Sequence, residues 1–170
     1  YPCRLPVWWA RVGESGPHLQ EDGITGKCVV LRIEKRFTRF ERLLAKLFRA
    51  PREVRRPLDM MNSMLWELCD GTRDFQSICQ AMDDIFNENI APAVDRTAAG
   101  IDSLQSRNLV TCLNDAFTLK WNIGPGQTPV HQTLAEMDEK IGYDVEPRTH
   151  VEKNLIEVNQ QGSQQDVQSE

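Results

Sequence analysis

The sequence predicts an α+β fold, in which a three-stranded antiparallel sheet is joined to a bundle of three helices. Two β-prone segments precede residue 36 and a third spans 52–58, whereas apolar residues between 62 and 107 recur at helical spacing. Because strands followed by a run of helices are typical of α+β proteins, this order predicts the class. The 170 residues, 40% of them apolar, suffice for one such domain with extensions.

The first half of the chain supplies the strands of the predicted sheet. Pro6–Val12 is bounded by proline and glycine, and Cys28–Lys35 begins with an apolar run. The glycine-rich segment 13–27 between them is expected to be a loop. The third strand is expected over Arg52–Leu58. Since Pro57 has no N–H to donate, this strand should lie at an edge of the sheet.

An amphipathic helix is expected as an insertion between the second and third strands, over Phe37–Phe48. The segment from Arg32 to Arg56 contains ten basic and three acidic residues, so its charge is +7 in a chain of net charge −5. Three interpretations stay open: a solvated helix face, a docking face for an acidic peptide or partner enzyme, and a membrane-surface helix.

Three further helices follow in the second half of the chain. Asn62 or Ser63 can cap the first helix, Asp74 can cap the second, and Pro92 suits the first turn of the third. Trp66, on the first of these helices, is expected to anchor the core. The third helix should turn four apolar residues inward: Val94, Ala98, Ile101 and Leu104.

The end of the predicted domain reads as a β-hairpin. Leu109–Leu113 and Ala116–Trp121 are β-prone and flank Asn114-Asp115, a hairpin turn signal. Three helices followed by a hairpin is the order of a winged helix-turn-helix, so the helical half is expected to resemble that fold.

A Gly-Pro-Gly sequence at 124–126 divides the chain into a domain, residues 1–123, and a C-terminal extension, residues 124–170. The extension is expected to be helical over Val130–Ile141. From Asn159 onward it is rich in Gln and Ser and is expected to be disordered.

Several classes of protein lack support in the sequence. The five cysteines are widely spaced without a C-x-x-C pair, which argues against a zinc site and a disulfide framework and favours a reducing cytoplasm. No apolar run approaches the roughly 20 residues of a membrane span. No histidine stands at a catalytic spacing, and no phosphate-binding loop or H-E-x-x-H occurs. We therefore expect a protein that is not an enzyme and uses no cofactor or metal.

One stretch of the chain resembles the PqqD-like family, the relatives of coenzyme PQQ synthesis protein D that serve as recognition elements for precursor peptides. The resemblance covers about residues 52–113, and its joint spacing is more specific than any single element. The matching residues are Leu58-Asp59, Trp66-Glu67-Leu68, Asp70-Gly71, Phe75, Ile78 and Leu109-Val110.

The resemblance implies a non-catalytic peptide chaperone or adaptor. Members of the family hold the leader of a precursor peptide and present it to a modifying enzyme, often a radical S-adenosylmethionine enzyme. The leader adds as a strand to the sheet edge, in a groove against the third helix. Carried to this chain, the site comprises Arg52, Glu53, Val54, Arg55, Arg56 and Leu58 on the strand, and Val94, Ala98, Asp102 and Gln105 on the helix.

Two other functions remain as alternatives: a winged-helix DNA-binding regulator and a membrane-peripheral interaction module. Against DNA, the helix 92–107 carries Asp95 and Asp102 beside Arg96 and Arg107, so it is neutral where a phosphate backbone demands positive charge. An exposed strand edge also leaves pairing with a second copy of the chain open.

Overall fold

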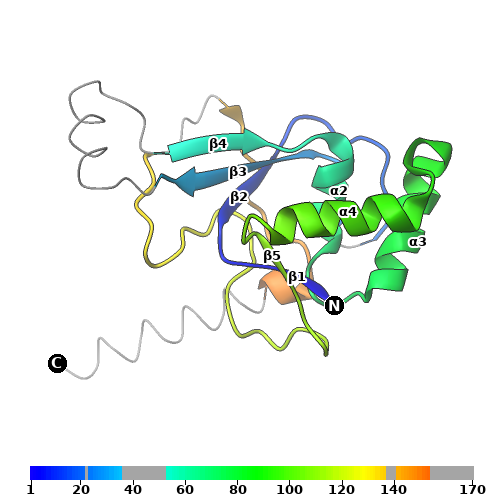
Figure 1. Ribbon diagram of the computed structural model, residues 1–170. Coiled ribbons are helices and arrows are strands. Elements are labelled where there is room, and N and C mark those ends of the chain that lie inside the picture. Colours follow the sequence, from blue (N-terminus) through cyan, green and yellow to red (C-terminus); the bar gives the residue numbers. More distant parts are fainter. Residues whose placement is uncertain (22, 36–52, 137–140, 154–170) are drawn as a thin grey trace.

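The computed structural model describes residues 1–21, 23–35, 53–136 and 141–153, and it confirms the predicted α+β class (Figure 1). The inserted helix predicted over 37–48, and Arg52, lie outside the described residues. The described strands are β1 (Pro2–Arg4), β2 (Trp8–Val12), β3 (Cys28–Glu34), β4 (Glu53–Pro57) and β5 (Val110–Cys112). The described helices are α2 (Met60–Leu68), α3 (Phe75–Phe86), the 3-10 helix η1 (Asn87–Ile90) and α4 (Ala93–Gln105).

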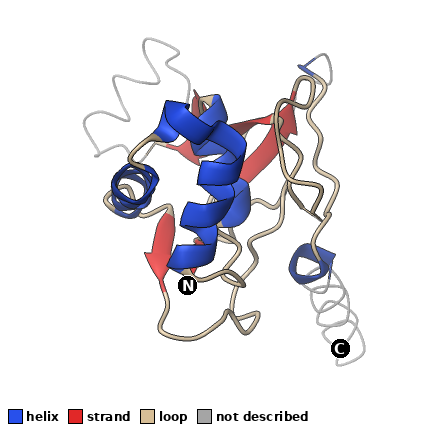
Figure 2. Ribbon diagram, turned by 90° about the vertical axis from the view of Figure 1, so that its right-hand side faces the viewer, coloured by secondary structure: helices blue, strands red, loops and turns tan. Residues whose placement is uncertain are grey.

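The sheet has the order β2-β3-β4 and is antiparallel throughout. Trp9 pairs with Leu31, and Ile33 pairs with Val54, so these side chains share the face that meets the helices. β4 lies at an edge, as Pro57 predicts. Figure 2 shows the longer helices gathered on one side of the sheet, and loops with the helical residues 150–153 on the other.

The helix starts follow from local capping chemistry. α2 begins at Met60, and its cap is the Asp59 carboxylate, which accepts from the Asn62 N–H. The prediction of Asn62 or Ser63 as the cap was therefore wrong, because Asp59 captures this N–H one turn earlier. Asp74 caps α3 as predicted, by accepting from the Ser77 N–H.

Trp66 anchors the core, as predicted: it is fully buried and packs edge-on against Trp9, with ring centroids 6.1 Å apart. The buried face of α4 differs from the prediction. Thr97, Ile101 and Leu104 are buried, whereas Val94 and Ala98 are exposed. The reason is the close approach of α4 to α2 at Gly100, where a Cβ atom would lie 2.6 Å from Leu65 Cδ2.

The predicted hairpin after α4 was wrong. β5 pairs instead with the N-terminal strand β1, in the register Cys3 to Thr111. Residues 113–121 form no strand and pack as a loop, in which the Phe117 N–H donates to the Gly71 carbonyl (2.9 Å). β1 thus occupies the position beside β5 that the second strand of the predicted hairpin would have taken. β1 was not predicted.

The C-terminal extension packs against the sheet. The Gly126 N–H donates to the Trp9 carbonyl (2.8 Å), and Asp144 exchanges two backbone hydrogen bonds with Arg11. The outer edge of β2 is therefore covered by the chain itself. The helix predicted over 130–141 is wrong over residues 130–136, which are not helical.

Candidate functional site

Two cavities lie between α4 on one side and the end of β4 with the start of α2 on the other. Their volumes are about 560 Å³ and about 380 Å³. Asp59, Asn62 and Ser103 line both, so the cavities adjoin one another along α4. We call the two together the groove.

The smaller cavity lies at the strand end of the groove. β4 and the residues after it contribute Arg56, Pro57 and Leu58 to its wall. The opposite wall comes from the last turn of α4 and the chain that follows it: Ser103, Leu104, Arg107 and Leu109. This cavity therefore opens beside the edge strand of the sheet.

The register of β4 decides which backbone groups face outward. The Leu58 N–H donates to the Val29 carbonyl (2.8 Å), and backbone groups alternate in direction along an antiparallel strand. Val54 and Arg56 therefore turn their backbone groups toward β3, whereas Glu53, Arg55 and Pro57 turn theirs to the outer side. No strand of the described part of the chain pairs with β4 on that side.

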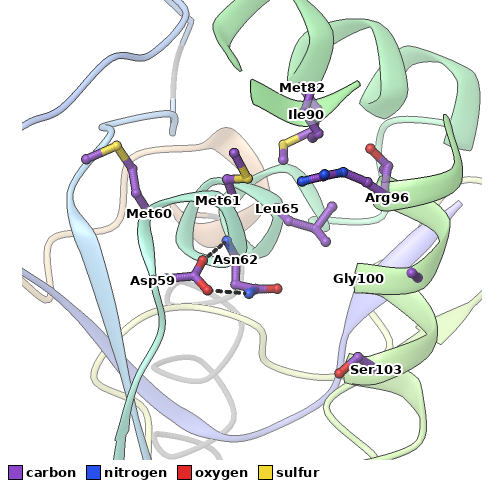
Figure 3. Close-up of a pocket in the computed structure, with 12 residues that line it drawn as sticks. Asp59, Met60, Met61, Asn62, Leu65, Met82, Ile90, Arg96, Gly100 and Ser103 are labelled. Carbon is purple, nitrogen blue, oxygen red and sulfur yellow. Dashed lines mark hydrogen bonds between the residues drawn. The ribbon is translucent and has the colours of Figure 1, made fainter. Parts of the chain in front are cut away.

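The larger cavity is mainly apolar. Met61 and Leu65 of α2 face Met82 and Ile90 across it, and α4 closes the remaining side (Figure 3). Met60 also lines the cavity, but its thioether points away from Met82 and Ile90, toward Gly16. We call this the methionine cavity. Methionine side chains are unbranched and flexible, so such a wall can adapt to the shape of an occupant.

The charge of the groove is positive. Its charged lining residues are Arg56, Arg96, Arg107 and Asp59, which sum to +2. The Asp59 carboxylate is already engaged, because its two oxygens accept from the backbone N–H and the side-chain amide of Asn62 (2.8 and 2.9 Å). None of the three arginines has an acidic partner among the residues that line the groove, although Arg96 donates to the Asn89 carbonyl (3.3 Å) and Arg107 to the Ser103 carbonyl (2.9 Å).

The acidic side chain of β4 is also engaged. Glu53 accepts from Arg32 (2.7 Å) and from Arg55 (3.0 Å) on the face of the sheet opposite the helices. Burial acts to raise the pKa of Glu53, but the hydrogen bonds from these two arginines and from the Ala135 N–H outweigh it, so the pKa is lowered. Glu53 is therefore a structural ion-pair partner.

The structure brings some of the predicted site residues together and separates others. Arg56 and Leu58 line the groove, and Glu53, Val54 and Arg55 belong to its edge strand. The four predicted helix residues are all exposed and line neither cavity of the groove: Val94, Ala98, Asp102 and Gln105.

Sequence reasoning missed the face of α4 that meets the groove. That face carries Arg96, Ala99, Gly100 and Ser103, and Arg107 follows the end of the helix. One signal could have found it: a glycine inside a helix marks close helix packing, and residues three or four positions from Gly100 share its face.

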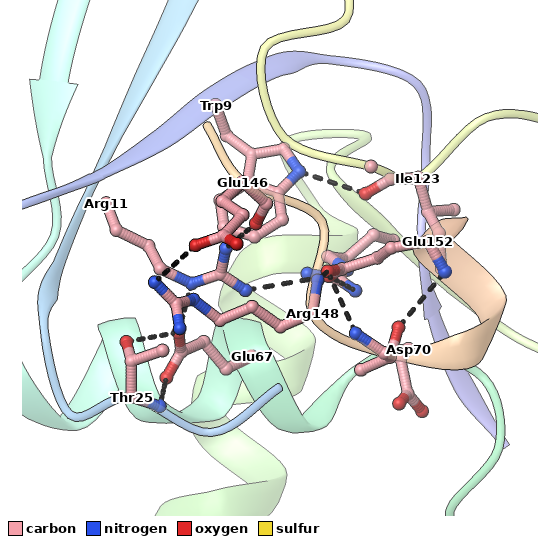
Figure 4. Close-up of polar contacts among 12 residues, drawn as sticks. Trp9, Arg11, Thr25, Glu67, Asp70, Ile123, Glu146, Arg148 and Glu152 are labelled. Carbon is pink, nitrogen blue, oxygen red and sulfur yellow. Dashed lines mark hydrogen bonds and ion pairs between the residues drawn. The ribbon is translucent and has the colours of Figure 1, made fainter. Parts of the chain in front are cut away.

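A buried ionic cluster lies outside the groove, where the extension meets the domain (Figure 4). The Arg11 guanidinium donates to Glu67 (2.6 Å), and Arg4 donates to Glu152 (3.0 Å). All four side chains are at most 1% exposed. The guanidinium groups of Arg4 and Arg11 also each lie 4.7 Å from the ring of Trp9.

Asp144 fastens the extension to β2 at the edge of this cluster. Burial acts to raise its pKa, but hydrogen bonds from Lys27, from the Glu146 N–H and from Arg148 outweigh it and lower the pKa of Asp144 to about 2. The extension is thus tied to the sheet by both backbone pairing and ion pairs.

Metal and membrane sites find no support in residues 1–21, 23–35, 53–136 and 141–153. Within these ranges no group of three or more His, Cys, Asp or Glu side chains is placed to hold a metal ion. None of the helices there combines the length and apolar character needed to cross a bilayer.

No family model, curated protein or solved structure matches this chain. The function is therefore inferred from the residues and geometry of the groove.

Proposed function

We propose that this chain is a non-catalytic peptide-binding module of the PqqD-like kind. It holds an extended segment of a precursor peptide in the groove and presents the rest of that peptide to a modifying enzyme, such as a radical S-adenosylmethionine enzyme. The observation that carries this proposal is the position of the groove. It lies between the edge strand β4 and α4, the place that the sequence resemblance implies for a leader peptide.

The physical basis is strand addition. An extended peptide can pair its backbone with the outward groups of β4, and every second side chain then points toward α4. The side chains on that face meet the two cavities, which supply selectivity. The opposite edge of the sheet, at β2, is occupied by the extension, so β4 is the edge at which a guest strand fits.

The cysteines support a non-catalytic, cytoplasmic role. Burial raises the pKa of the Cys3 thiol to about 12, and burial also raises the pKa of Cys69. Thiols with raised pKa values are poor nucleophiles. All five cysteines are free in the structure, an arrangement compatible with the proposed reducing compartment.

The structure gives no support to the alternative of DNA binding. α4 carries Asp95 and Asp102 against Arg96, so the helix that would enter a groove of DNA has no excess of positive charge. The expected wing is missing from the described residues, since 113–121 form a loop. We therefore propose a single function.

The test is a selection of random peptides, displayed on phage, against the immobilised full chain. Binding of the enriched peptides is then measured by calorimetry on two tryptophan variants. Ser103→Trp fills the point shared by both cavities, and Gln80→Trp places the same side chain on an exposed position of α3. We expect Ser103→Trp to abolish binding and Gln80→Trp to preserve it. Equal affinities for the two variants, or no enriched peptide, would overturn the proposal.

A further inference from the structure

Pairing of a peptide backbone with β4 does not by itself need a pocket such as the methionine cavity. Its volume of about 560 Å³ falls in the range typical of pockets that bury a ligand, roughly 300–1,000 Å³. It lies on the α2 side of the groove, beyond the end of β4. None of the peptide-binding residues predicted from the sequence lines it. A side chain of the guest peptide is the natural occupant, since the methionine cavity adjoins the smaller cavity beside β4 at Asp59, Asn62 and Ser103.

The lining of this cavity favours an aromatic side chain. Met61 and Met82 present two thioether groups, and sulfur makes favourable contacts with the edges of aromatic rings. Arg96 lies in the same lining and can place its guanidinium over a ring face. Leu65 and Ile90 complete an apolar wall that rewards burial of a large ring.

The charge of the groove favours acidic residues beside that ring. Arg56, Arg96 and Arg107 contribute the positive charge, although the chain as a whole carries −5. The excess is local, because the neighbouring exposed surface of α3 and η1 carries Asp83, Asp84 and Glu88. Charge complementarity therefore selects an anionic guest for the groove in particular.

We infer that the guest is an acidic peptide with an aromatic side chain seated in the methionine cavity and carboxylates facing Arg56, Arg96 and Arg107. This inference rests on the proposed function, since the aromatic residue belongs to the strand that pairs with β4. Alternate residues of a strand share a face, so the pattern is acidic, any, aromatic, any, acidic.

The test uses the probe peptide acetyl-Asp-Thr-Phe-Thr-Asp-amide and the full chain labelled with ¹³C at its methionine methyl groups. An aromatic ring in the cavity produces ring-current shifts of the methyl signals of Met61 and Met82. Met64 is 1% exposed and is not among the residues that line the cavity, so its signal should stay in place.

Two control peptides separate the two parts of the inference. Replacing Phe by Ala should weaken binding roughly tenfold or more, because the buried ring is lost, and should abolish the ring-current shifts. Replacing both Asp residues by Asn should weaken binding severalfold and remove its dependence on salt. If the Asn peptide binds equally well, the acidic part is wrong.

Two leucine variants test the location. Ala99 is exposed and lines the methionine cavity, so Ala99→Leu should fill part of the cavity and weaken binding of the probe peptide. Gln80→Leu adds the same side chain to an exposed position of α3 and should leave binding unchanged. A peptide that perturbs the backbone amides of β4 but leaves the methionine methyl signals unmoved would overturn this inference while preserving strand addition.

Discussion

Replacing Glu152 by alanine should destabilise the whole fold, although Glu152 lies in the extension beyond the expected domain boundary. Its carboxylate accepts from Arg4 (3.0 Å), and the two side chains are each 1% exposed. The Nη2 atom of Arg4 makes this bond, and its Nε and Nη1 atoms have no hydrogen-bond partner among the described residues. Glu152→Ala therefore leaves a buried guanidinium without its anion, which costs about 3–5 kcal/mol of unfolding free energy.

The magnitude is checked by urea unfolding, followed through tryptophan fluorescence, with Glu146→Ala as the matched control. The Glu146 side chain is 71% exposed and pairs with Arg148 at 3.2 Å, so its removal should cost at most about 1 kcal/mol. The double variant Arg4→Met with Glu152→Met should recover most of the loss, because it removes both buried charges. A cost for Glu152→Ala no larger than that of the control would refute the view that the extension is part of the fold.

Three other substitutions probe the packing and the pH dependence. Asp144→Asn should lower the free energy of unfolding by at most about 2 kcal/mol at neutral pH. Because folding lowers the pKa of Asp144 from 3.8 to about 2, this loss should shrink as the pH falls from about 4 to 2. Urea unfolding of the two proteins at each pH measures it. Trp66→Ala should lower the free energy of unfolding by about 3–5 kcal/mol in urea titrations, because the ring is fully buried. Gly71→Ala should cost about 2 kcal/mol or more in thermal unfolding, because Gly71 has φ +82° and an added Cβ would lie 2.5 Å from Phe117 Cβ; an unchanged midpoint would contradict this.

Features that depend on neighbours in the sequence were predicted well. The apolar run of β3, the Asp74 cap of α3 and the buried Trp66 follow from periodicity and capping chemistry. The edge position of β4 follows from Pro57, whose missing N–H suits a strand with one partner. The position of β4 at the edge of the sheet could therefore be predicted from the sequence of that strand alone.

Features that depend on distant partners could not be predicted. β1 exists because residues 2–4 meet β5 more than 100 positions later, and Arg4 is paired by Glu152, 148 positions away. Neither contact leaves a local pattern. The helix side of the groove was misplaced for a similar reason, because the rotation of α4 is fixed by the contact of Gly100 with Leu65.

The measurement that tests the central claim most directly is hydrogen exchange on the guest peptide itself. A selected peptide, labelled with ¹⁵N and bound to the full chain, is exposed to deuterated water, and the exchange rate of each peptide amide is recorded. A strand added to β4 pairs alternate residues, so every second amide should be protected. Protection of consecutive amides, as in a helix, or no protection at all would contradict the claim that β4 and α4 hold an extended peptide.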